Sequence, residues 1–424
     1  MNILVMSNVI EINNHRIVTE FNNEENEIIK IAPKSYNEFF ENFLLPNKPC
    51  VFDAQITTNW PSRNDWKNND EPNFDYLKLQ FGDCQVPIAD CNKRVYNAQC
   101  KNNMSIKEYI NYWIDYQKCN YSNQMPLLYL KDWHCVNSNT NIYFYEVPQY
   151  FASDWLNEYF IAHPDLNDDY MFVYMGPKGS WTPLHVDVFT SYSWSANIVG
   201  KKRWLFFPPD QGTFLKNKNG DLIYDISTVQ LNDNSNNNNN DFDNNCTNEK
   251  NIMKTPKSIE IIQESGQIIF VPSGWYHQVW NLEDTISINH NWINGCNIRK
   301  IWAALQNELL AVMKEIEDCK DMDNWNNHCQ IMLKASFGIN YIQFYEFLLF
   351  IAEQRIQSVI NNVPLVSFKK WSLGRNHCLF DLRQIRNVLQ SFIEDVKEKN
   401  ISSLVFKNYN VEDLILRIDE SLSI

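Results

Sequence analysis

The chain has 424 residues, of which 44% are hydrophobic and 14% aromatic, which is enough to bury a large core and excludes a disordered chain. Its formal net charge of −14 argues against direct nucleic-acid binding, because phosphates would be repelled. The 11 cysteines include no CxxC pair, which is typical of reduced thiols rather than a disulfide framework. No apolar run approaches the roughly 20 residues of a membrane helix, and no basic signal-peptide segment opens the chain. We therefore expect no membrane association and a cytoplasmic location, with the nucleus as a further compartment.

Helix and strand signals alternate in the first part of the chain. Ser35 with Glu38, and Ser105 with Glu108, form capping-box patterns that each predict the start of an amphipathic helix. Between them, the apolar residues 49–52 predict a short buried strand. This mixture favours a flank of α and β elements.

The middle of the chain changes to short apolar, aromatic and β-branched runs, broken by Gly, Pro and Asn. Six runs predict strands: residues 127–130, 170–175, 191–199, 203–207, 268–271 and 285–293. Many short strands with turn signals predict a sandwich or barrel rather than a parallel α/β sheet. Gly200, which lies between two of the runs, predicts a hairpin corner.

These patterns divide the chain into three regions. Residues 1–126 form the mixed α/β flank, 127–295 a mostly β core, and 296–424 an α-helical region with apolar residues at helical spacing. We interpret the apolar stripes of the helices as packing faces, and a homodimer through them is a further hypothesis. Residues 231–258 are rich in Asn and Asp, so we expect a disordered surface loop inserted in the core.

The eight histidines narrow the search for a chemical site. His185 and Asp187 are two residues apart, so in an extended strand their side chains project from the same face. One imidazole and one carboxylate, completed by a second imidazole, form the facial triad of non-haem Fe(II) sites, which leaves positions open for substrates. Taken alone, an HxD pair is explained more simply as a polar pair at a strand end.

The residues around the pair supply further support. Residues 176–187 read GPKGSWTPLHVD, and residues 200–209 read GKKRWLFFPP. Residues 266–277 read GQIIFVPSGWYH and bring in a second histidine, His277. This order of segments resembles the Jumonji-C (JmjC) family of Fe(II)- and 2-oxoglutarate-dependent oxygenases.

The resemblance implies a double-stranded β-helix, which is a cupin-like barrel of two facing sheets with the metal inside. This fold agrees with the strand pattern of the core. The family motif assigns His185, Asp187 and His277 to the iron, as metal ligands and catalytic residues. It also implies Fe(II) as the cofactor, and 2-oxoglutarate and O2 as co-substrates.

The resemblance further implies a buried cation beneath the far carboxylate of 2-oxoglutarate, with polar groups beside it. Lys202 matches the family's lysine for that carboxylate. Thr182 and Tyr129 match its hydroxyl donors, although core packing explains Tyr129 equally well. Asn197 stands two residues beyond the family's usual asparagine positions, where this chain has serines, and Asn289 matches a polar pocket position.

Within the family, the chain resembles members that hydroxylate a lysyl side chain of the eukaryotic translation release factor, and the similarity covers most of residues 35–360. It therefore implies a lysyl hydroxylase with that factor as protein substrate. Demethylation of N-methyl-lysine is the enzymatic alternative, and a non-catalytic JmjC binding module is the other. The acidic net charge favours a basic partner but does not identify which one.

Overall fold

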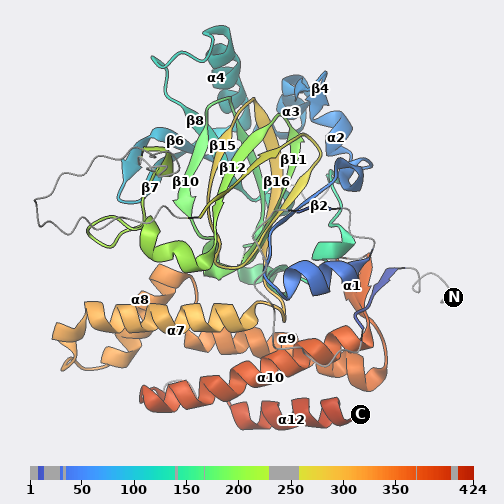
Figure 1. Cartoon of the computed structure of the whole chain (residues 1–424), viewed down its shortest axis with the longest axis vertical. Helices are drawn as coiled ribbons and strands as arrows, with labels where there is room; N and C mark the ends of the chain where they lie inside the picture. The colour runs from blue at the N-terminus through green and yellow to red at the C-terminus, as the bar shows by residue number, and fades with distance from the viewer. Residues whose placement is uncertain are drawn as a thin grey trace, which may run out of the picture.

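The computed structural model shows a β-barrel above a layer of helices (Figure 1). It describes residues 8–13, 29–31, 35–138, 142–166, 168–228, 257–368, 370–402 and 409–424. Apart from residues 257 and 258, the Asn-rich segment that the sequence predicts as a loop lies outside the described residues.

Two facing sheets form the barrel. The larger has the strand order β2-β3-β14-β11-β16-β9-β8-β6-β7, and the smaller β10-β15-β12-β13. The strands of the larger sheet are β2 (Ile29–Ile31), β3 (Cys50–Phe52), β6 (Gln85–Val95), β7 (Ala98–Ser105), β8 (Leu128–Trp133), β9 (Met171–Gly176), β11 (Tyr192–Val199), β14 (Ile268–Val271) and β16 (Thr285–Trp292). Those of the smaller sheet are β10 (Trp181–His185), β12 (Lys202–Phe207), β13 (Ile259–Gln263) and β15 (Tyr276–Asn281). The predicted mostly β core is confirmed, and all six predicted strand runs are found.

The flank before residue 127 contributes strands to the larger sheet. The hairpin of β6 and β7 pairs with β8, with Ile88 opposite Leu130, and β3 pairs with β14. The predicted capping box is also present, because the Ser105 hydroxyl and the Glu108 side chain each bond the other's backbone at the start of α4 (Ile106–Lys118). Shorter helices here are α1 (Tyr36–Phe39), α2 (Ser62–Asp65) and α3 (Phe74–Phe81).

The helical layer packs its apolar stripes on one another. Its helices are α7 (Ile298–Glu315), α8 (Trp325–Phe337), α9 (Tyr341–Asn361), α10 (Arg375–Glu398) and α12 (Val411–Ser423). Trp302 of α7 stacks on Phe344 of α9 at 5.4 Å between ring centroids and also contacts Phe392 of α10. The predicted packing faces are therefore confirmed. Among the described residues no single helix passes a length and hydropathy test for a membrane span; α8 and α9 pass it only together, with a 66° bend between them.

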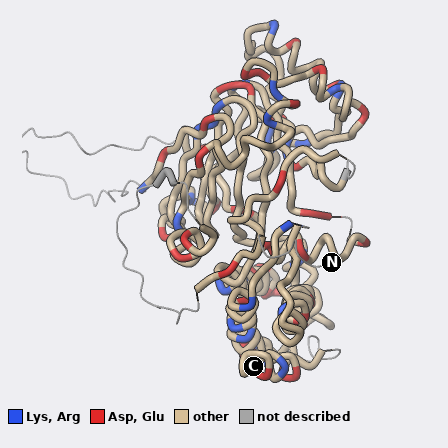
Figure 2. Tube along the Cα trace, turned by 90° about the vertical axis from the view of Figure 1, so that its right-hand side faces the viewer, with Lys and Arg blue, Asp and Glu red and all other residues tan. Residues whose placement is uncertain are grey.

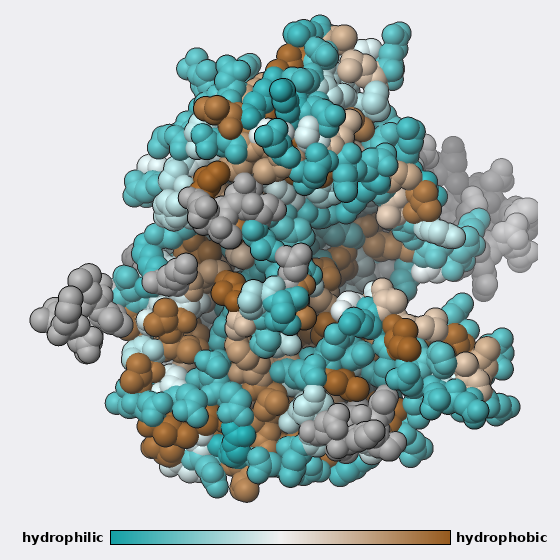
Figure 3. All heavy atoms as spheres, turned by 180° about the vertical axis from the view of Figure 1, so that it is seen from behind, coloured by the Kyte–Doolittle hydropathy of each residue, from teal (hydrophilic) through white to brown (hydrophobic). Residues whose placement is uncertain are grey.

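The surface mixes charges of both signs over the barrel and the helices (Figure 2). Seen from behind, hydrophobic residues are more frequent on the helical half than on the barrel half (Figure 3). Exposed apolar side chains of the helical region include Leu310, Ile331 and Leu416. The barrel half is mainly hydrophilic on this face.

A buried ion pair joins the helical layer to the rest of the fold. Arg355 of α9 is fully buried and contacts Glu158 of α6 (Trp155–Ala162) and, at 3.1 Å, Asp381 of α10. The indole nitrogen of Trp155 donates to the same Asp381 carboxylate. Three helices thus share one guanidinium, and removing it takes away the cation that Glu158 and Asp381 have in common.

We expect Arg355→Met to destabilise the protein by about 3–5 kcal/mol, because breaking a buried pair leaves an uncompensated charge. Arg417→Met is the matched control: Arg417 forms a partly exposed pair with Glu353, and such pairs contribute about 0–1 kcal/mol. Urea denaturation measures both free energies of unfolding. Equal losses for the two variants would contradict a structural role for the buried pair.

Candidate metal centre

Three of the predicted residues converge inside the barrel. The ligand atoms of His185, Asp187 and His277 all lie within 4.8 Å of one another. The two imidazole rings are 4.2 Å apart between centroids, and His277 Nε2 lies 4.0 Å from Asp187 Oδ1. Two ligands of one metal ion at about 2.1 Å each can be no more than about 4.2 Å apart. The cluster therefore fits one ion with small side-chain adjustments.

Backbone pairing places these side chains. His185 ends β10 directly opposite His277 of β15 in the antiparallel register, and residues so paired have neighbouring Cβ atoms. Asp187 follows in extended conformation, at the start of a short 3-10 turn. The Ser193 hydroxyl of β11 donates to Asp187 Oδ2 at 2.6 Å, which fixes the orientation of the carboxylate.

Backbone carbonyls set the tautomer of both histidines. His185 Nδ1 lies 2.8 Å from the Pro183 carbonyl oxygen, and His277 Nδ1 lies 3.2 Å from that of Trp275. Because a carbonyl oxygen only accepts, each Nδ1 carries the proton and donates it. The lone pair is thereby left on Nε2, the atom that binds a metal; metal-binding histidines usually donate their other ring nitrogen to a carbonyl or carboxylate oxygen in this way.

The electrostatics of the cluster favour a cation. Burial, together with the neighbouring His277, lowers the pKa of His185 to about 4, so this imidazole is neutral at pH 7. Two imidazoles and a carboxylate on one side of an ion are the donor set of non-haem Fe(II) sites. The residues present therefore fit the iron that the resemblance implies.

A buried lysine lies deeper in the barrel. Lys202 of β12 is 2% exposed, and its ammonium donates to the Ser287 hydroxyl of β16 at 2.7 Å. Within the described parts of the chain, no carboxylate forms an ion pair with Lys202. Burial lowers its pKa to about 7, which records the cost of holding a charge there without an anion. Such a group fits the far carboxylate of 2-oxoglutarate.

Asn289 lies close to this lysine. Its amide nitrogen approaches both the carbonyl and the hydroxyl oxygen of Ser287, at 3.3 and 3.2 Å. Lys202 and Asn289 thus share one serine. Thr182 lies on β10 opposite Val279, on the strand that ends at His185.

The other two predicted co-substrate residues have structural partners. Tyr129 of β8 is 2% exposed and lies against Gly176, where an added Cβ would come within 2.5 Å of its ring. The Asn197 amide nitrogen donates to the Gly200 carbonyl oxygen at 2.6 Å. Gly200 turns the predicted hairpin with a φ of +76°. A role for Tyr129 and Asn197 in binding 2-oxoglutarate stays a prediction.

Sequence reasoning missed the two serines that orient the site, Ser193 and Ser287. Strand alternation contains the signal for Ser287, because it is two residues from Asn289 and faces the same side. It also missed the aromatic side chains that pack on the second histidine: Trp204 and Phe206 stack on the His277 ring at 5.8 and 5.7 Å between centroids, with interplanar angles of 29° and 30°.

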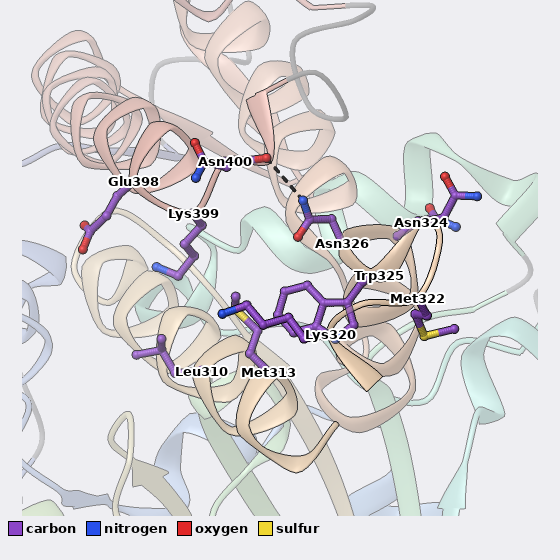
Figure 4. Close-up of a pocket in the computed structure, with 11 residues that line it drawn as sticks. Leu310, Met313, Lys320, Met322, Asn324, Trp325, Asn326, Glu398, Lys399 and Asn400 are labelled. Atoms are coloured by element: carbon purple, nitrogen blue, oxygen red, sulfur yellow. Dashed lines mark hydrogen bonds between the residues drawn. The ribbon is translucent and has the colours of Figure 1, made fainter. Parts of the chain in front are cut away.

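A separate cavity of about 870 Å³ lies in the helical layer. Trp325 and Met313 line it, with Lys399 and Asn400 on its rim (Figure 4). The residues that line it include no member of the metal cluster. It is therefore not part of the candidate centre.

The fold and the cluster define a cupin-like protein with a metal centre. Residues 36–297 match the family model of the cupin-like domain. The 2-oxoglutarate and iron-dependent oxygenase JMJD4 of Gallus gallus is 46% identical over 390 residues, which are 89% of this chain and 88% of that protein. The human protein of the same name is 42% identical over 374 residues, covering 88% and 86%. The arginine-specific demethylase JMJ20 of Arabidopsis thaliana is 38% identical over 408 residues, covering 92% and 81%.

These matches extend over nearly the whole chain, and several exceed 40% identity. The chain therefore belongs to the cupin-like JmjC family of 2-oxoglutarate- and iron-dependent oxygenases.

We expect Asp187→Ala to abolish iron binding while the protein stays folded, because the strands pack through apolar faces that do not include this carboxylate. Iron content after anaerobic loading, with the melting temperature as the fold measurement, checks both statements. Ser193→Ala is the matched variant: it keeps all three ligands and should weaken iron affinity by about 10–100-fold. Full iron retention by Asp187→Ala would refute the assignment of this ligand.

We expect Lys202→Met to stabilise the ligand-free protein at pH 7 by about 1–4 kcal/mol, as replacement of buried charges often does. Between the folded pKa of about 7 and the ordinary value of 10.5, the unfolded chain holds a proton that the folded protein lacks. The free energy of unfolding therefore rises with pH between these two values. We expect the variant to lack this part of the pH dependence.

Urea denaturation at several pH values measures this slope. The same substitution should raise the 2-oxoglutarate concentration needed for binding at least about tenfold, since a charged hydrogen bond is removed. A variant with unchanged 2-oxoglutarate affinity would show that another cation holds the co-substrate.

Proposed function

We propose that this chain is an Fe(II)- and 2-oxoglutarate-dependent protein hydroxylase that acts on a lysyl side chain of the eukaryotic translation release factor. The observation that carries the oxygenase chemistry is the convergence of His185, Asp187 and His277 above the buried ammonium of Lys202. The lysyl substrate is supported by the resemblance of the sequence to release-factor hydroxylases. The cytoplasm, where translation ends, is the compartment this function requires.

When bound, Fe(II) with 2-oxoglutarate and O2 supplies the oxidising power to hydroxylate an unactivated C–H bond, with succinate and CO2 as the other products. The chain's own residues position the reactants. His185 and His277 offer Nε2 lone pairs, and Ser193 holds the carboxylate of Asp187 in place. Trp204 and Phe206 cover the second histidine and exclude water from that side.

Lys202 and its polar neighbours hold the co-substrate in one orientation. Lys202 donates to the far carboxylate, so the other end of the small diacid points to the metal cluster. Ser287 holds the ammonium in place when the pocket has no anion, and the Asn289 amide adds a second donor beside it. The protein thus binds and orients, and the bound groups supply the reactivity.

N-demethylation is the second candidate, and the similarity to the arginine-specific demethylase JMJ20 favours it. Hydroxylation of an N-methyl group yields a carbinolamine that releases formaldehyde, so the same centre serves both reactions. The relatives named as JMJD4 oxygenases reach higher identity, from 40% to 46%. An intact cluster with Lys202 supports an enzyme over a binding module.

Mass spectrometry of the release factor, incubated with the protein, Fe(II), 2-oxoglutarate and O2, tests the proposal. We expect one lysine to gain the mass of one oxygen atom, and Asp187→Ala to give no gain. Peptides carrying methylated lysine or arginine run in parallel, with formaldehyde as the readout. Formaldehyde release without oxygen gain on unmodified lysine would replace hydroxylation by demethylation.

A further inference from the structure

Strand β8 contains a bulge beside the candidate metal centre. Its register with β9 shifts between Leu130 and Trp133. Within the shift, Asp132 has a φ of +59°, a left-handed conformation that residues other than glycine rarely adopt. Bulges next to active sites redirect side chains, and strained backbone of this kind persists where surrounding contacts hold it.

The bulge sends two neighbouring side chains to different surroundings. Lys131 is 7% exposed and donates to Gln99 Oε1 at 2.6 Å. Asp132 is partly exposed, and its Oδ1 accepts a hydrogen bond of 2.7 Å from the Tyr174 hydroxyl. Its Oδ2 forms an ion pair with Lys101 of β7.

Tyr174 connects this carboxylate to the interior of the barrel. It lies on β9 opposite Ser287, the partner of Lys202, and its ring meets Tyr129 edge-on at 6.2 Å. Burial raises the pKa of the Tyr174 hydroxyl, and both Asp132 and Asp187 raise it further. Asp132 is therefore one hydrogen bond away from a residue that lies opposite Ser287, and its own side chain is partly open to solvent.

The ion pair between Asp132 and Lys101 indicates which kind of ligand Asp132 binds. Lys101 and Asp132 are 46% and 36% exposed, and ion pairs between such exposed groups are weak and readily exchanged. Tyr174 donates to Oδ1 and Lys101 pairs with Oδ2, so a cation that displaces Lys101 binds a single oxygen, Oδ2. A lysine ammonium, which is a point charge, suits one oxygen, whereas an arginine fork is best matched by two.

We propose that Asp132, oriented by the β8 bulge and Tyr174, binds the ammonium group of the target lysine, and that Lys101 occupies this position until substrate displaces it. The inference rests on the lysyl substrate of the proposed function and makes Asp132 the residue that selects it. An ammonium fixed at Asp132 restricts where the carbons of the lysine side chain can lie relative to the metal cluster.

Ligand-observed NMR on the full-length protein loaded with Zn(II) and 2-oxoglutarate tests the site without turnover. The probes are n-butylammonium, which mimics the end of a lysine side chain, and neutral n-butanol. We expect Asp132→Asn, which preserves shape and the acceptor for Tyr174, to weaken n-butylammonium binding about fivefold or more. Binding of n-butanol should not change.

Two further variants make the result specific. Asp168→Asn removes an exposed carboxylate near His134 and should leave n-butylammonium binding unchanged. Lys101→Met removes the resident ammonium and should strengthen it. Equal n-butylammonium binding by Asp132→Asn and the unmodified protein, or no binding by the latter, would overturn the proposal, as would weaker binding by Lys101→Met.

Activity on the release factor provides the second measurement. With the lysyl substrate, Asp132→Asn should raise KM about tenfold and change kcat less, because the lost contact binds the side chain and does not touch the reacting carbon. An unchanged KM would contradict the role of Asp132. A protein that binds n-butylammonium through Asp132 but adds no oxygen to lysine would instead contradict the proposed function alone.

Discussion

The antiparallel pairing of β10 with β15 is the constraint on which the site depends. It sets His185 opposite His277, with their rings 4.2 Å apart, through backbone hydrogen bonds that need no metal. The carbonyls of Pro183 and Trp275 then fix both tautomers. Because backbone groups supply the alignment, the two imidazoles are arranged before any ion arrives, and binding has little conformational entropy to lose.

The polar groups inside the barrel lower the stability of the ligand-free protein, but they suit a small anion. A buried ammonium whose described contact is a hydroxyl is unfavourable in isolation, and further polar atoms nearby add to this cost. Among the described residues, Ser195 Oγ, Asn197 Oδ1 and Asn281 Oδ1 are buried without a hydrogen-bond partner. Apolar side chains in these positions would give a more stable barrel, so the polar interior is best explained by a ligand.

Much of the centre could be predicted from sequence because the relevant signals are local. The HxD spacing follows from strand alternation, and the same alternation separates Lys202 from Lys201. The apolar runs marked the core strands because both of their faces are buried: every residue of β11 and of β14 is buried. By contrast, β7 reads AQCKNNMS and is largely exposed, so no hydrophobic pattern distinguishes it from a loop.

Other features depend on tertiary register and left no local signal. Ser193 reaches Asp187 only because the fold brings β11 to the 3-10 turn that follows β10. The left-handed Asp132 likewise has no signal in the sequence: the predicted strand covers residues 127–130, whereas β8 continues through the bulge to Trp133. Propensity does not predict such a residue, because the contacts that hold it come from β7 and β9.

The β6–β7 hairpin of the N-terminal flank contacts both sheets of the barrel. Gln99 of β7 accepts from buried Lys131 and donates to the Trp181 carbonyl oxygen of β10, at 3.1 Å, so the hairpin connects the larger sheet to the edge strand of the smaller one. Lys101, two residues along the same strand, reaches Asp132. His185, His277 and Lys202 lie on β10, β15 and β12 of the smaller sheet, whereas Lys101 and Asp132 lie on β7 and β8 of the larger sheet. On the proposal that Asp132 binds the substrate, substrate choice changes on the larger sheet while the metal ligands of the smaller sheet stay the same, in line with relatives named as oxygenases and as a demethylase.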